Sequence, residues 1–84
     1  MMFSIQYFAS VREQLGSAGE TLEASGQIHT VADLTAMLAA RGGAWTVLED
    51  RHAVLVAVDQ TVADRNRALT GHEEVAFFPP MTGG

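Results

Sequence analysis

One strongly marked amphipathic helix constrains the fold of this chain more than any other feature of the sequence. Thr30 and Asp33 have the spacing of a capping box, in which the threonine hydroxyl accepts the Asp33 N–H and the aspartate reaches back to the start of the helix. Apolar residues then recur at helical spacing and form a single stripe, made of Val31, Leu34 and Leu38. A stripe of this kind is expected to face a sheet.

The predicted helix ends in an arginine, Arg41, followed by the glycine pair Gly42 and Gly43. Glycine readily adopts the left-handed conformation that ends helices, and a cation in the last turn complements the helix dipole. A chain of 84 residues has room for one domain, and a single main helix can cover only one face of a sheet. The other face is therefore expected to lie open.

Short segments with the pattern of β-strands surround this helix. Residues 3–8 alternate, so that Phe3, Ile5 and Tyr7 share one face, and residues 53–58 are apolar on both faces, which is typical of a strand inside a sheet. The expected strands are residues 3–8, 20–24, 53–58 and 74–78, with a brief fifth strand near Val62. The pattern predicts an α+β domain with a mixed four- to five-stranded sheet packed on one main helix.

Two smaller elements complete this expectation. Residues 9–16 favour one or two turns of helix that end at a glycine. Residues 44–50 are ambiguous between a turn and a short helix, and they are expected to bury Trp45 and Leu48.

Two phenylalanines are expected on the open face of the sheet. Successive side chains of a strand point to opposite faces, so if Val75 and Phe77 pack under the helix, Ala76 and Phe78 lie on the other side. Phe8 leaves its strand toward that side too. Phe8 and Phe78 would then form an exposed aromatic patch, which in small soluble proteins often marks a binding surface. The alternative is that a loop covers both rings.

Composition excludes several classes of function. The net charge is −5, with five arginines and no lysine, so phosphate backbones would be repelled and nucleic acid is not an expected partner. A P-loop needs a lysine, so the absence of lysine excludes a nucleotide site of this kind. The chain has no cysteine, and its three histidines (His29, His52 and His72) are not spaced as metal ligands, so no metal site is expected. No group of residues suits acid–base or nucleophilic catalysis.

The pattern of apolar residues also bears on the cellular location of the protein. The longest apolar run, residues 53–58, is far too short to cross a bilayer, and the first residues lack the pattern of a signal peptide. A cytoplasmic location and no membrane partner are expected.

The C-terminal segment, which reads FFPPMTGG, is the most unusual part of the chain. Pro79 and Pro80 favour an extended conformation, and six residues beyond Phe78 could reach about 20 Å. Gly83 and Gly84 have no side chains, so they can enter a narrow passage. Adenylation by ATP would activate the Gly84 carboxylate, and a sulfur nucleophile could then leave a thiocarboxylate. We therefore divide the chain into a folded domain, residues 1–78, and an extended tail, residues 79–84.

Residues 69–84 resemble the C-terminal segment of a known family, the small subunits of molybdopterin synthase, which are ubiquitin-like β-grasp sulfur carriers. That family ends in the pattern G-D-E-V-A-F-F-P-P-V-x-G-G. Residues 7–16 and 55–60 resemble two further segments of the family, so the likeness spans the whole chain. The departures are the pair His72 and Glu73 at an acidic turn, Asp59 where asparagine is common and Met81 where valine is common. The matching residues are Gly71, Glu74, Val75, Ala76, Phe77, Phe78, Pro79, Pro80, Gly83 and Gly84.

The resemblance implies a β-grasp fold and a cycle of sulfur transfer. An E1-like adenylyltransferase would use ATP to activate Gly84, and a sulfur donor enzyme would convert it to a thiocarboxylate. The tail would enter the large synthase subunit and give its sulfur to cyclic pyranopterin monophosphate, forming the molybdopterin dithiolene within a heterotetramer. The chain itself would bind no cofactor and would be a non-catalytic, sulfur-donating subunit. The residues expected to bind the partner are Phe8, Phe78, Pro79, Pro80, Met81, Thr82 and Gly83.

Three other functions stay open at this point. The chain could carry sulfur for another pathway, such as that of thiamine. It could be a ubiquitin-like modifier whose Gly84 forms an isopeptide bond with a target protein. It could also be a non-covalent adaptor in which the terminal glycines have no chemical role.

Overall fold

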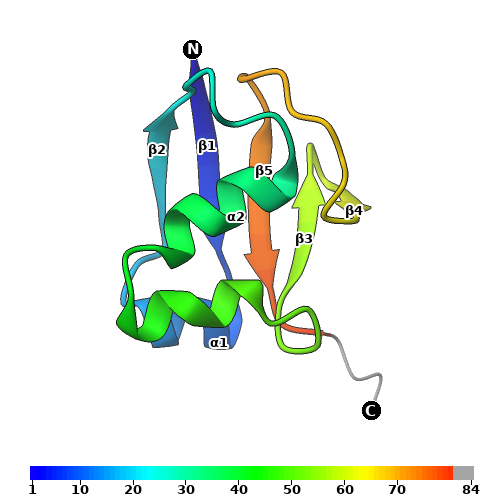
Figure 1. Ribbon diagram of the computed structural model, residues 1–84. Helices are drawn as coiled ribbons and strands as arrows, with labels where there is room; N and C mark the ends of the chain where they lie inside the picture. Colours follow the sequence, from blue (N-terminus) through cyan, green and yellow to red (C-terminus); the bar gives the residue numbers. More distant parts are fainter. Residues whose placement is uncertain (81–84) are drawn as a thin grey trace.

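Five strands and two α-helices, with one 3-10 helix, make up the described part of the chain, residues 1–80 of a computed structural model (Figure 1). In chain order the elements are β1 (Met2–Tyr7), α1 (Ala9–Leu15), β2 (Gly19–Glu23), α2 (Val31–Ala39), η1 (Gly43–Glu49), β3 (Leu55–Val58), β4 (Thr61–Ala63) and β5 (Glu74–Phe78).

The strands form one mixed sheet in the order β2-β1-β5-β3-β4. The first strand pairs antiparallel with β2 and parallel with β5, and β3 runs antiparallel to both β5 and β4. Helix α2 crosses one face of this sheet, and α1 and η1 lie near the end at which β5 finishes (Figure 1). The predicted architecture, a mixed sheet on one main helix, is confirmed.

The core lies between α2 and the sheet, and the alternation of the strands explains its composition. Phe3, Ile5 and Tyr7 are all buried on the helix side of β1, as are Val75 and Phe77 on β5. The apolar stripe of α2 packs against these side chains. It consists of Val31, Leu34 and Leu38, each with no exposed surface.

The start of α2 has the capping box that the sequence predicts. The Asp33 N–H donates to Thr30 Oγ1 over 3.2 Å, and Asp33 Oδ2 accepts the N–H groups of His29 and Thr30 over 2.9 and 3.1 Å. The His29 hydrogen bond is the largest of the contacts that lower the pKa of Asp33. These contacts satisfy N–H groups that would otherwise lack partners at the helix start.

The end of α2 differs from the prediction. The helix ends at Ala39 with Ala40 as its right-handed C-cap, so Arg41 follows the helix instead of standing in its last turn. Gly42 and Gly43 do have the expected positive φ angles, 81° and 57°. Gly43 is already the first residue of η1, which resolves the ambiguity of residues 44–50 in favour of a short helix. Arg41 follows the helix, and its guanidinium binds Glu20 of β2.

A two-residue turn joins β3 to β4, and its geometry accounts for one departure from the family pattern. Asp59 and Gln60 have φ angles of 50° and 69°, as a tight hairpin turn requires. Asp59 tolerates this conformation nearly as well as asparagine does. Its Oδ1 also accepts the Glu74 N–H over 3.0 Å and so links the turn to the start of β5.

Among residues 1–80, no helix combines the length and the apolar character needed to cross a bilayer.

Candidate functional site

The face of the sheet opposite α2 carries the predicted aromatic patch. Phe78 pairs with Leu55 across β5 and β3, and Ala76 pairs with Ala57 in the same way, so all four residues face the open side. Phe8 continues β1 in an extended conformation, and 44% of its surface is exposed. Phe78 is partly exposed. No loop in the described part of the chain covers Phe8.

The open face is larger than the two aromatic rings that the sequence predicts. Val62 of β4 pairs with Ala57, and 68% of its surface is exposed, the highest value for a valine, leucine, isoleucine or phenylalanine among the exposed apolar residues. Leu55 lies directly beside Phe78. Sequence reasoning missed both Leu55 and Val62. The apolar character of residues 53–58 on both faces was the available signal, but only the strand register shows which residues join the patch. We call Phe8, Leu55, Ala57, Val62, Ala76 and Phe78 the open-face patch, in which Ala57 and Ala76 are buried, each with 9% of its surface exposed.

The tail leaves the domain from the centre of the sheet. Strand β5 pairs with β1 on one side as far as Phe77 and with β3 on the other side as far as Phe78. The Phe8 N–H donates to the Phe77 carbonyl over 3.0 Å, and the buried Phe77 ring stacks on Tyr7 at a centroid distance of 5.9 Å. The end of β5, which is the base of the tail, is therefore fixed by strands on both sides and by the packing of Phe77 on Tyr7.

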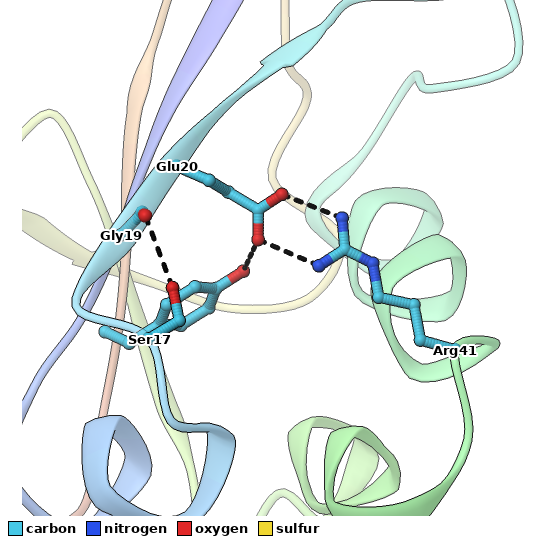
Figure 2. A network of polar contacts seen from close by, with 5 residues as sticks. Ser17, Gly19, Glu20 and Arg41 are labelled. Carbon is cyan, nitrogen blue, oxygen red and sulfur yellow. Dashed lines mark hydrogen bonds and ion pairs between the residues drawn. The ribbon is translucent and has the colours of Figure 1, made fainter.

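A polar network braces this base from the edge of the sheet (Figure 2). Glu20 Oε2 accepts the Tyr7 hydroxyl over 3.0 Å, and both Glu20 oxygens accept the Arg41 guanidinium, over 2.7 and 2.8 Å. The Arg41 guanidinium also lies 4.4 Å from the centre of the Trp45 ring, which meets Tyr7 edge-on at 5.5 Å. Burial, followed by the hydrogen bond to Glu20, raises the pKa of Tyr7. The hydroxyl is therefore a fixed donor.

The turn before β5 is organised around a buried carboxylate. Glu73 is 7% exposed and accepts the N–H groups of Thr70, Gly71 and His72 and the Thr70 hydroxyl, over 2.8 to 3.1 Å. Burial alone would raise the pKa of Glu73, but these hydrogen bonds together lower it to about 2. This is the position of the acidic turn in the family pattern. The structure shows that the carboxylate fixes the backbone where β5 begins.

The remaining predicted residues belong to the tail. Pro79 is partly exposed and Pro80 is exposed. Met81, Thr82, Gly83 and Gly84 lie outside the described residues.

Comparison with known proteins adds the decisive observation. The model of the ThiS family matches residues 5–84, which is nearly the whole chain. The chain belongs to the ThiS family. Two curated relatives of this ThiS-family chain are named molybdopterin synthase sulfur carrier subunit. The one from Escherichia coli is 37% identical and the one from Haemophilus influenzae is 31% identical, each over 83 residues that cover 99% of this chain and all of the relative.

A solved structure shares the fold of this ThiS-family chain. The small archaeal modifier protein SAMP1 from Haloferax volcanii is 26% identical, with a TM-score of 0.74, and the match covers all of both chains. The β-grasp fold that the family resemblance implies is thereby confirmed.

Residues 1–80 contain no group of three or more histidine, aspartate or glutamate side chains placed to hold a metal ion. His29, His52 and His72 are all exposed, as expected for turn residues. The distinctive features are instead an apolar open face and a firmly held strand from which the tail leaves.

Proposed function

We propose that this chain is the sulfur carrier subunit of molybdopterin synthase and that Gly84 is its reactive residue. An E1-like adenylyltransferase joins the Gly84 carboxylate to AMP and releases pyrophosphate from ATP. Sulfide-level sulfur supplied by a sulfur donor enzyme then attacks the acyl carbon, displaces AMP and leaves a thiocarboxylate. The tail delivers this sulfur to cyclic pyranopterin monophosphate in the large subunit, water supplies the oxygen that replaces it, and the tail is released as a carboxylate. The chain binds no cofactor, and ATP is used by the activating enzyme.

One observation carries this proposal: the full-length relationship, at 37% identity, to a protein named molybdopterin synthase sulfur carrier subunit. The word subunit in that name supports a partner, for which we propose the large synthase subunit. A cytoplasmic location and a heterotetramer of two carriers and two large subunits belong to the same proposal.

The geometry supports a division of labour between the two subunits. The open-face patch lies beside the base of the tail, so one partner surface could hold the patch and accept the tail at the same time. The chain carries a net charge of −5, which disfavours a binding site for an anionic pterin phosphate on its own surface. The larger subunit would supply the cations and the catalytic groups.

A second candidate function has a specific observation in its favour. The structural neighbour SAMP1 is named a modifier protein, and its similarity covers the full length of this chain. A modifier would use the same activated Gly84 but would transfer it to an amine of a target protein.

Intact-mass analysis tests the proposal. The full chain is incubated with ATP, its cognate adenylyltransferase and a sulfur donor, and the mass is measured with and without ATP. We expect an ATP-dependent gain equal to the difference between sulfur and oxygen, located at Gly84 by fragmentation. A chain with one alanine appended after Gly84 is the matched control and should show no gain at unchanged thermal stability.

The other outcomes contradict the proposal in different ways. High-mass conjugates on other proteins would favour the modifier. An unchanged mass despite a competent activating enzyme would favour an adaptor. A thiocarboxylate that the large subunit cannot use, with cyclic pyranopterin monophosphate as substrate, would favour another sulfur pathway.

A further inference from the structure

Ala9 has a backbone conformation that alanine rarely adopts. Its φ angle is 52°, in the left-handed region, where a Cβ atom crowds the following carbonyl oxygen. Within residues 1–80, the other non-glycine residues with positive φ angles are Asp59 and Gln60, and their hairpin turn requires such angles. Ala9 stands instead where β1 ends and α1 begins. Its conformation therefore needs another explanation.

The residue before Ala9 breaks a second local rule. Phe8 is the N-cap of α1, a position that favours serine, threonine, aspartate and asparagine because their side chains accept N–H groups of the first turn. Phe8 offers no such acceptor, so the start of α1 has no side-chain cap among residues 1–80. The ring is also 44% exposed, so burial does not explain its presence. A serine or aspartate followed by glycine would suit this junction better in the isolated domain.

The backbone of Phe8 is nevertheless fixed on both sides. Its N–H donates to the Phe77 carbonyl over 3.0 Å, which ties it to the strand that carries the tail. Its carbonyl accepts the N–H groups of Val11 and Arg12 over 3.1 and 3.3 Å, so the first turn of α1 forms on it. The chain makes both sets of bonds by turning from strand to helix at a single residue, Ala9. The left-handed angle of Ala9 therefore fixes where Phe8 stands relative to the end of β5.

We propose that Ala9 is a positioning residue, whose left-handed conformation holds Phe8 on the open face in the orientation that the large subunit binds. The proposal rests on the proposed function, since it takes the large subunit as the partner that docks on the open-face patch. Two adjacent residues that both lower the stability of a junction, where better local choices exist, are typical of a functional site. Alanine restricts the junction more than glycine would, because glycine admits many other backbone conformations.

Binding of the cognate large subunit to matched variants tests this proposal. A9G removes the steric strain but frees the junction, so we expect Tm to rise by about 2–5 °C while binding weakens about threefold. A36G makes the same replacement at an exposed alanine of α2, on the other side of the sheet (Figure 1). It should lower Tm and leave binding within about 1.5-fold of the natural chain. A9G should have no further effect on binding when F8S has already removed the ring.

Hydrogen exchange tests the positioning in the free chain, without any partner. The Phe8 N–H is held by the Phe77 carbonyl, so A9G should speed its exchange severalfold. The Ser4 N–H donates to the Glu73 carbonyl over 3.2 Å at the other end of β1 and is the internal control. Its exchange should not become faster in A9G, because the strain is relieved only at the junction.

Several results would overturn the proposal. Equal binding by A9G and the natural chain would show that docking does not depend on a fixed Phe8. An equal loss from A9G with and without F8S would place the effect elsewhere than the ring. Unchanged Phe8 exchange in A9G would show that the junction keeps its shape without the alanine side chain. A natural chain that forms the thiocarboxylate at Gly84 but does not bind the large subunit would overturn the proposed function, whereas the exchange measurement would still decide whether Ala9 positions Phe8.

Discussion

Arg41 and Glu20 form a bidentate ion pair across 21 residues of sequence, with Nη1–Oε2 and Nη2–Oε1 distances of 2.8 and 2.7 Å. The pair ties the loop after α2 to the edge strand β2 (Figure 2). It also presents the guanidinium to Trp45 and leaves Glu20 Oε2 to accept the Tyr7 hydroxyl. One partly exposed ion pair thus connects the side chains that pack beneath the end of β5.

Replacing Arg41 by lysine should destabilise the domain. A lysine keeps the charge but cannot form the two parallel hydrogen bonds to Glu20 or stack on Trp45 in the same way. Because the pair is partly exposed, we expect a loss of only about 0.5–1.5 kcal/mol in the free energy of unfolding, measured in urea. Arg12→Lys, an exposed position without an ion pair among residues 1–80, is the control and should change stability little.

Stability should fall in acid because of Glu73. Its pKa is lowered from 4.5 to about 2, so the folded state holds the ionised form more strongly than the unfolded state does. The stabilisation is complete above pH 4.5 and is lost as the pH falls toward 2, by about 3 kcal/mol at most. Urea unfolding at several pH values measures this slope. Glu73→Gln should be less stable at neutral pH and should lose most of the slope, and an unchanged slope would exclude Glu73 as its source.

Arg65→Met should be strongly destabilising although it adds an apolar side chain to an apolar region. The carbonyls of Leu48 and Val54 would lose their donors, and each unpaired buried group costs about 1–3 kcal/mol. We expect a total loss of about 2–4 kcal/mol in thermal or urea unfolding. Arg67→Met at an exposed site is the matched comparison. If the two variants were equally stable, the carbonyl contacts of Arg65 would contribute nothing measurable.

Phe8→Ser should separate binding from stability. The ring is 44% exposed, so its loss should change the free energy of unfolding by less than about 1 kcal/mol. Binding to the large subunit should weaken about tenfold, because aromatic anchors carry a large share of interface energy. Met37 is exposed on α2, away from the open face, and Met37→Ser provides the control. Equal effects of the two variants on binding would argue against docking at the open-face patch.

Gly19 should tolerate no side chain, for reasons of contact rather than backbone angle. A Cβ atom at this position would lie 2.6 Å from the carbonyl oxygen of Ile5 on the neighbouring strand. Gly19→Ala should therefore push β2 away from β1 and cost about 1–3 kcal/mol, measured by urea unfolding. Gly26→Ala is the comparison, since nothing lies within 4 Å of its added Cβ. A neutral Gly19→Ala would show that the edge strand shifts freely.

Much of the candidate site follows from local patterns in the sequence. The alternation of residues 3–8 and 74–78 places Phe8 and Phe78 on the open side, and the structure confirms both positions relative to the buried Phe77. Alternation does not show which strands lie next to each other. Leu55 and Val62 are therefore assigned to the patch only from the strand order β2-β1-β5-β3-β4, in which β3 lies beside β5 and β4 lies beside β3.

Features that depend on residues close together in the chain follow from the sequence. The capping box of Thr30 and Asp33, the buried face of β1 and the proline and glycine residues of the C-terminal segment all involve neighbours within a few positions. Contacts between distant segments, such as Arg41 with Glu20 and Arg65 with the Leu48 and Val54 carbonyls, are seen only in the folded protein. A charged side chain has many possible partners of opposite charge in a sequence, and the sequence does not distinguish among them. Only strand register and helix packing bring one of them within hydrogen-bonding distance.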